Sequence, residues 1–75
     1  MNILSIAGSD PSSGAGIQND LKTFSRYGAY GLTVITSITS QNTSKFSGVI
    51  PLTSKAVSEQ LNSVFSDFKI NAIKI

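Results

Sequence analysis

Hydrophobic and polar positions divide the chain into alternating strand-like and helix-like segments. Ile3 to Gly8 carries apolar side chains at both odd and even positions, which predicts a short strand covered on both faces. Leu32 to about Ser40 is rich in β-branched residues and predicts a second strand. Ile70 to Ile75 predicts a third, and Val49 and Ile50 predict a brief extended piece after a polar loop.

Two amphipathic helices are predicted between these strands, from Gly14 to about Tyr27 and from about Ser54 to Phe68. We expect Thr53 or Ser54 to cap the second helix. Each helix has an apolar stripe at helical spacing, formed by Ile17, Leu21, Phe24 and Gly28 in the first and by Val57, Leu61, Val64, Phe65 and Phe68 in the second.

This order of elements, β-α-β-loop-α-β, predicts an α/β fold with a parallel sheet and crossover connections. Three strands and two helices would leave much of such a sheet uncovered. The sequence also stops within an apolar strand, "INAIKI". We therefore expect residues 1–75 to be the first part of a longer α/β domain, and the sequence leaves open whether they fold alone.

Composition excludes several function classes. The 75 residues contain no cysteine and no histidine, which excludes Ser-His-Asp and Cys-His triads and the usual zinc sites within them. Six basic and four acidic residues give a net charge of +2, and the basic residues are scattered, so we expect no nucleic-acid surface. No apolar run is long enough for a membrane span or a signal peptide, so the cytoplasm is the expected location.

The glycine-rich segment "GSDPSSGAG" lies where many α/β proteins hold a phosphate. A Walker A loop needs GxxxxGK[ST], but five residues separate Gly8 from Gly14, and Ala15 stands in place of the lysine. A dinucleotide fingerprint needs GxGxxG, but Asn19 replaces its third glycine, and no acid follows the second strand. The segment is therefore not a Walker A loop, and its match to a dinucleotide fingerprint is weak.

Two interpretations of this segment remain open. In the first it is an ordinary strand-to-helix turn, which Asp10-Pro11 begins, with Ser12 or Ser13 as the helix cap. In the second its glycines let a ligand approach the backbone at the carboxyl end of the first strand, where open parallel sheets bind their ligands.

Two polar residues are candidates for contact with such a ligand. Asp20 lies beside the apolar stripe, which predicts a carboxylate partly withdrawn from bulk water. It is either a first-turn acid near the helix dipole or an acceptor that faces a pocket above the first strand. Gln41 closes the second strand. Its carboxamide could pair with a heteroaromatic edge that shows an amino group beside a ring nitrogen, or it could bond its own loop.

The stretch "IAGSDPSSGAGIQNDLKTFSRYGAYGLTVITSITSQNT" closely resembles the start of the hydroxymethylpyrimidine/phosphomethylpyrimidine kinases of thiamine biosynthesis. The resemblance continues through "VSEQLNSVFSDF" and "INAIKI", and it covers essentially all 75 residues. It implies a ribokinase-like, Rossmann-like fold, with a parallel-rich sheet and helices on both faces.

The resemblance also implies an activity and a site. Such enzymes use ATP and Mg²⁺ to phosphorylate the hydroxymethyl group of an aminopyrimidine, and then the resulting monophosphate. Gln41 matches the residue that grips the pyrimidine edge, and Asp20 and the backbone around Gly8 match positions that line the pocket. The loop at the pocket rim contains Asp10, Ser13, Gly14 and Gly16.

The chain departs from the family in several respects, two of which bear on the expected site. Ser13 stands where the family usually has the first of two adjacent glycines, which predicts a stiffer loop. Members of the family are several times longer, and their nucleotide site and the cysteine that activates the substrate hydroxyl lie in the later part. We therefore expect no catalytic, cofactor-binding or metal-binding residue in this chain, and no catalysis by it alone.

Three alternatives to a pyrimidine kinase remain open. A pyridoxal or pyridoxine kinase of the same superfamily is the nearest, although Gln41 followed by Asn42 favours the pyrimidine branch. A non-catalytic truncated remnant is the second. A dinucleotide-dependent oxidoreductase is disfavoured by Asn19 and the missing acid. The sequence does not decide whether the full-length protein forms a homo-oligomer.

Overall fold

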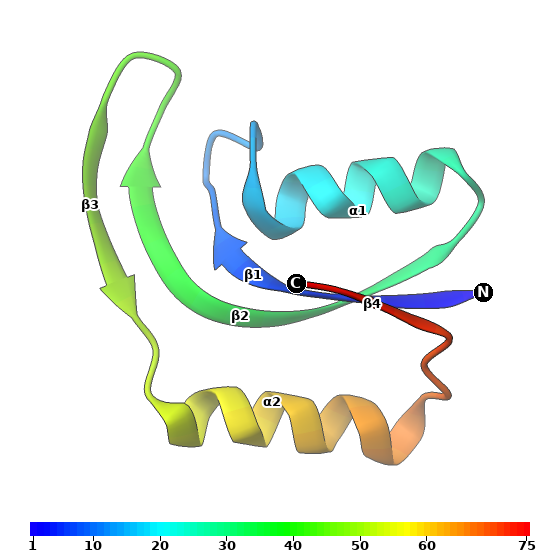
Figure 1. The fold of residues 1–75 in the computed structure, drawn as a ribbon. Coiled ribbons are helices and arrows are strands. Elements are labelled where there is room, and N and C mark those ends of the chain that lie inside the picture. Colours follow the sequence, from blue (N-terminus) through cyan, green and yellow to red (C-terminus); the bar gives the residue numbers. More distant parts are fainter.

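The computed structural model describes all of residues 1–75 as a four-stranded sheet with one helix on each face (Figure 1). The strands lie in the order β3-β2-β1-β4, and β1 runs parallel to both of its neighbours. The predicted α/β class is confirmed. The elements are β1 (Asn2–Ser9), α1 (Gly16–Arg26), β2 (Tyr30–Gln41), β3 (Phe46–Pro51), α2 (Ser54–Asp67) and β4 (Ala72–Lys74).

The sheet is mixed, because β3 pairs antiparallel with the second half of β2. The sequence predicted only a brief extended piece there, whereas β3 has six residues. Conversely, β4 has only three residues within the strand predicted from Ile70 to Ile75, and its pairing with β1 runs from Ala72 to Lys74.

The interior of the sheet is formed by β1 and β2. Leu4 and Val34 are fully buried, and Ile17 of α1 is buried against this layer. Helix α1 approaches β2 closely at Gly31, where an added Cβ would lie 2.5 Å from Cδ2 of Leu21. The close fit between α1 and the sheet therefore depends on the missing side chain at Gly31.

The two helices begin in different ways. Thr53 caps α2, as predicted, because its hydroxyl accepts the amide of Ala56 at 3.1 Å. The predicted cap of α1 by Ser12 or Ser13 is wrong, since its N-cap residue is Ala15 and no side chain caps it. Neither helix is long and apolar enough to cross a membrane.

Candidate functional site

The loop between β1 and α1 is folded around the carboxylate of Asp10, a residue that is only 4% exposed. Its Oδ1 accepts the amide and the hydroxyl of Ser12 at 2.8 and 2.6 Å, and its Oδ2 accepts the amide of Ala15 at 2.9 Å. The Asp10 carbonyl accepts the amide of Ser13 at 3.0 Å, which closes the predicted turn. Asp10 thus orders the loop backbone, where Ser12 or Ser13 was expected to cap the helix.

These contacts also set the charge of the loop. The hydrogen bond from the Ser12 hydroxyl lowers the pKa of Asp10 below its usual value, and burial acts in the opposite direction. Backbone amides of Ser12, Ala15 and Gly14 lower this pKa further. Asp10 is therefore a fixed internal anion whose carboxylate is used by its own loop.

The glycines hold three segments in close contact. Gly16 has φ of +64°, and an added Cβ would collide with the carbonyl oxygen of Gly8. A Cβ at Gly8 would in turn lie 2.6 Å from Oγ of Ser37 on β2. Ser13 also has a positive φ, +67°, a conformation that favours glycine. This agrees with the glycine that the resemblance implies at that position.

Side-chain hydrogen bonds that meet at Ser9 join the ends of β1 and β2. Gln41 donates from Nε2 to Oγ1 of Thr39, which donates to the carbonyl of Ser9, both at 2.8 Å. Gln18 donates from Nε2 to Oγ of Ser9, and its Oε1 accepts the amide of Asp10, again at 2.8 Å. Gln41 is thus connected to the rim loop through Thr39 and Gln18, neither of which the sequence singled out.

A tight turn explains why β2 ends at Gln41. The side-chain oxygen of Asn42 accepts the amides of Ser44 and Lys45 at 2.8 and 3.0 Å, and the Asn42 amide donates to the Lys45 carbonyl at 2.9 Å. Asn42 is therefore used by the turn itself, while Gln41 remains at the carboxyl edge of the sheet.

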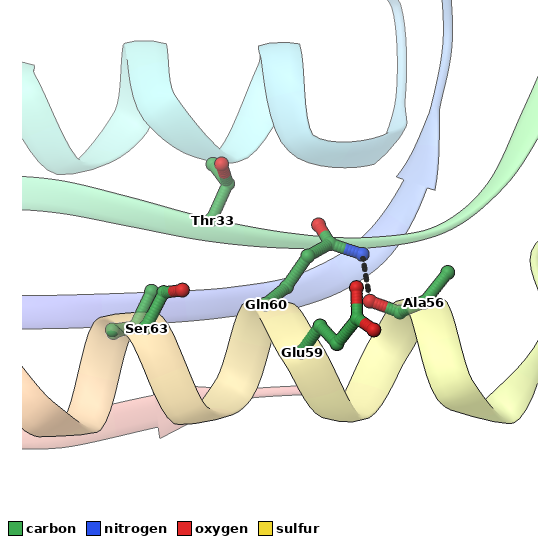
Figure 2. A pocket seen from close by; sticks show the side chains of 6 residues that line it. Thr33, Ala56, Glu59, Gln60 and Ser63 are labelled. Atoms are coloured by element: carbon green, nitrogen blue, oxygen red, sulfur yellow. Dashed lines mark hydrogen bonds between the residues drawn. The ribbon is translucent and has the colours of Figure 1, made fainter.

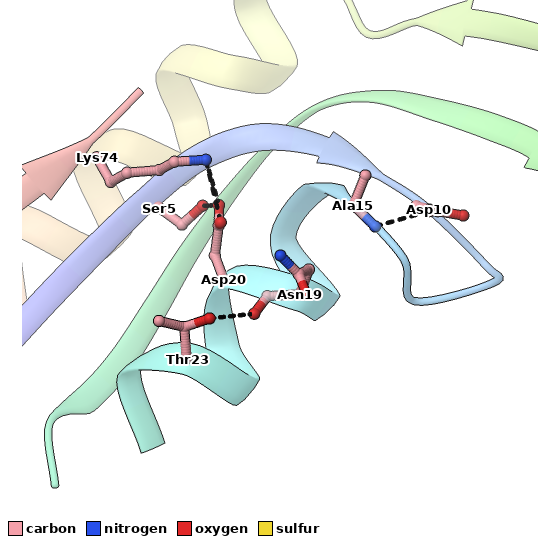
Figure 3. A network of polar contacts seen from close by, with 7 residues as sticks. All are labelled: Ser5, Asp10, Ala15, Asn19, Asp20, Thr23 and Lys74. Carbon is pink, nitrogen blue, oxygen red and sulfur yellow. Dashed lines mark hydrogen bonds and ion pairs between the residues drawn. The ribbon is translucent and has the colours of Figure 1, made fainter. Parts of the chain in front are cut away.

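Asp20 lies elsewhere, between α1 and the middle of β1, and is 7% exposed (Figure 3). Its Oδ2 accepts the hydroxyl of the fully buried Ser5 at 2.6 Å, and both of its oxygens lie 3.0–3.1 Å from Nζ of Lys74. Helix α1 begins at Gly16, so Asp20 is not a first-turn acid, and the helix-dipole interpretation is wrong.

The pKa of Asp20 lies below its usual value. Burial acts to raise it, but the hydrogen bonds from Ser5 and Lys74 and the positive charge of Lys74 outweigh that effect. The expected withdrawal of Asp20 from water is confirmed. Lys74 was missed because it lies 54 positions further along the chain.

The structure thus divides the predicted site residues into two groups. The first group, at the carboxyl edge of β1 and β2, contains Gly8, Asp10, Ser13, Gly14, Gly16 and Gln41. The second is Asp20 alone, whose partner Ser5 precedes Gly8 on β1.

A hollow of about 450 Å³ lies on the other side of the sheet, beside α2 (Figure 2). Gln60 crosses it and binds both backbone groups of Ile35 on β2, at 2.8 Å each. No predicted site residue lines this hollow, whose walls are Thr33, Ala56, Glu59, Gln60, Ser63 and Val64. The chain also brings no three carboxylate, imidazole or thiolate groups together.

A model of the phosphomethylpyrimidine kinase family matches residues 10–75. The chain belongs to this family. It is 55% identical, over its whole length, to the hydroxymethylpyrimidine/phosphomethylpyrimidine kinases of Escherichia coli and Salmonella typhimurium. It spans 28% of the length of each of those proteins.

Solved structures of relatives have the same fold. The phosphomethylpyrimidine kinase of Clostridium difficile matches all of the chain with a TM-score of 0.96 and 52% identity, over 35% of its own length. The pyridoxal kinase of Staphylococcus aureus, solved with pyridoxal, matches 96% of the chain with a TM-score of 0.85 and 40% identity, over 27% of its own length. The predicted ribokinase-like, parallel-rich fold is confirmed.

Proposed function

We propose that residues 1–75 are the N-terminal, substrate-binding part of a single ribokinase-like kinase domain. The full-length protein would transfer the γ-phosphate of ATP to 4-amino-5-hydroxymethyl-2-methylpyrimidine, and then phosphorylate the monophosphate. The observation that carries this proposal is the family match over residues 10–75, together with a polar carboxyl edge that ends in Gln41.

Gln41 is the residue proposed to recognise the pyrimidine. The hydrogen bond to Thr39 uses one N–H, which leaves the other N–H and Oε1 for a ligand. An amino group beside a ring nitrogen offers the complementary donor and acceptor. The backbone at Gly8 is proposed to form the adjacent wall, where an added Cβ would lie 2.6 Å from Oγ of Ser37. The rim is proposed to be the loop that contains Asp10, Ser13, Gly14 and Gly16.

Asp20 is proposed to serve this pocket indirectly. Its oxygens already accept bonds from Ser5 and Lys74, so it contributes a fixed negative charge between α1 and β1 and not a free acceptor. Substrate binding would then depend on Asp20 through the position of α1 and not through a direct contact.

The ATP and Mg²⁺ sites are proposed to lie outside these 75 residues. Phosphoryl transfer needs a nucleotide cradle, metal ligands and a group that positions the attacking hydroxyl. The acidic residues of this chain do not gather into a metal centre, and Asp10 is occupied by its own loop. The chain alone is therefore proposed to be inactive, and the complete enzyme to act on a small molecule in the cytoplasm, without nucleic acid or membrane partners.

Pyridoxal kinase is the second candidate, because the Staphylococcus aureus enzyme shares 40% identity with this chain. The test is a phosphotransfer assay on the full-length protein, with ATP and either the hydroxymethylpyrimidine or pyridoxal as acceptor. We expect the pyrimidine monophosphate to form first and the diphosphate to follow. Preferential phosphorylation of pyridoxal would establish the alternative, and transfer to neither acceptor would indicate a non-catalytic remnant.

A further inference from the structure

We propose that Thr39 determines specificity by fixing which end of the Gln41 carboxamide faces the ligand. This inference rests on the proposed function, since it concerns how the same pocket recognises the hydrogen-bonding edge of a pyrimidine. Thr39 lies two residues before Gln41 on β2, and both side chains are partly buried at the carboxyl edge of the sheet.

The direction of the hydrogen bonds follows from chemistry. Oγ1 of Thr39 lies 2.8 Å from the carbonyl oxygen of Ser9. A carbonyl oxygen can only accept, so the hydroxyl proton of Thr39 must point to Ser9. Thr39 then offers only lone pairs to its other neighbour. Gln41 must therefore present its NH₂ group to Thr39, at 2.8 Å.

Rotation of the Gln41 amide by 180° would break this arrangement. It would place Oε1 of Gln41 against an oxygen of Thr39 that has no proton left to donate. The hydroxyl would have to leave Ser9 to restore a bond, and the Ser9 carbonyl would lose that partner. Only one amide orientation therefore keeps both hydrogen bonds, and it leaves Oε1 and one N–H of Gln41 unpaired within the chain.

Ser9 itself is held by a second glutamine. Gln18 of α1 donates to Oγ of Ser9, and its own orientation is fixed because its Oε1 accepts from the backbone amide of Asp10. Ser9, whose carbonyl orients Thr39, is thus tied through its hydroxyl to Gln18 of α1, which also binds the rim loop. An aminopyrimidine benefits from this fixed polarity, because its amino group needs an acceptor and its ring nitrogen needs a donor.

The matched test compares Thr39→Val, Thr39→Ala and Thr39→Ser in the full-length protein. Valine keeps the shape of threonine without the hydroxyl, alanine is a second hydroxyl-free variant, and serine keeps the hydroxyl. Affinities are measured by calorimetry for 4-amino-5-hydroxymethyl-2-methylpyrimidine and for 5-hydroxymethyl-2-methylpyrimidine, which lacks the amino group. Thermal melts establish that each variant is folded.

We expect Thr39→Val and Thr39→Ala to weaken the amino ligand about threefold to tenfold, as for the loss of one hydrogen bond. The ligand without the amino group should change less than about twofold, since either amide orientation gives it a donor. Thr39→Ser should restore the difference. Equal losses for both ligands, or none, would overturn the role of Thr39. A wild-type protein that binds neither ligand would overturn the proposed function as well.

Discussion

Nζ of Lys74 lies 3.0 Å from Oδ1 of Asp20, and this ion pair joins the edge strand β4 to α1. Asp20 also accepts the hydroxyl of Ser5 on the intervening strand β1 (Figure 3). One carboxylate therefore connects β4 to the consecutive elements β1 and α1, although Lys74 lies 54 positions after Asp20. Because the carboxylate is buried and the ammonium is half exposed, its contribution lies between those of surface and interior pairs.

Replacing Lys74 by methionine should destabilise the full-length protein by about 1–3 kcal/mol, because Asp20 would keep a buried charge without its cation. Urea unfolding measures the change. Lys55→Met is the matched control, since Lys55 pairs with Glu59 at 3.8 Å on the exposed surface of α2. The control should change stability by less than about 0.5 kcal/mol. Equal effects of the two variants would contradict the role of Lys74.

The ion pair should also give stability a defined acid dependence. The pKa of Asp20 is lower in the folded protein than its usual value of 3.8, so at acidic pH the unfolded state binds more protons. The stability from Asp20 is therefore fully present above about pH 5 and is lost as pH falls through the folded pKa. The difference in unfolding free energy between wild type and Asp20→Asn should be constant above about pH 5 and shrink below about pH 4. A pH-independent difference would contradict this linkage.

Gln41→Ala should weaken binding of the aminopyrimidine to the full-length protein by about 1–3 kcal/mol, because it leaves the polar edge of the ligand unpaired. Calorimetry measures the affinity. Gln41 donates within the chain only to Thr39, so the melting temperature should change little. An unchanged affinity would remove Gln41 from the site, whereas a large loss of stability would assign it a structural role.

Gly16 and Gly28 provide a test of the close contact between the rim loop and β1. Both have positive φ, +64° and +76°, but only at Gly16 would a Cβ strike another segment, the carbonyl of Gly8. Gly28→Ala should cost about 1 kcal/mol, from backbone conformation alone. Gly16→Ala should cost at least about 3 kcal/mol, since the collision adds to that strain. Similar unfolding free energies for the two variants would show that the loop moves freely away from Gly8.

The periodicity of the sequence predicted the elements but not every pairing. Apolar stripes and β-branched runs report local burial, and they placed both helices and the strands β1 and β2 within a few residues. They did not predict β3 at its full length, because Phe46, Val49 and Ile50 are exposed and pair through the backbone with β2. Such pairing depends on the neighbouring strand and not on the side chains.

The candidate site was also predicted only in part, as the strand pairing was. The position of Asp20 beside the apolar stripe predicted its burial, but its partner Lys74 depends on how β4 joins the sheet. The cap of α1 was predicted wrongly, because the preference for serine at helix N-termini is a local rule that ignores the rest of the loop. In the fold, the carboxylate of Asp10 takes the amides of Ser12 and Ala15 instead. Residue roles at the proposed substrate pocket remain predictions, which the variants of Gln41 and Thr39 address.

The two hydrogen bonds from Gln60 to the backbone of Ile35 affect which backbone groups of β2 are available to another molecule. Strand β3 covers β2 only from Ser37 onward, so within these 75 residues the earlier part of β2 has no strand beside it on that side (Figure 1). Free backbone groups on such an edge invite a strand from another molecule. The carboxamide of Gln60 occupies the N–H and the carbonyl of Ile35, so an incoming strand cannot form hydrogen bonds with them. A single side chain on α2 thus removes both hydrogen-bonding groups of Ile35 from this open edge of the sheet.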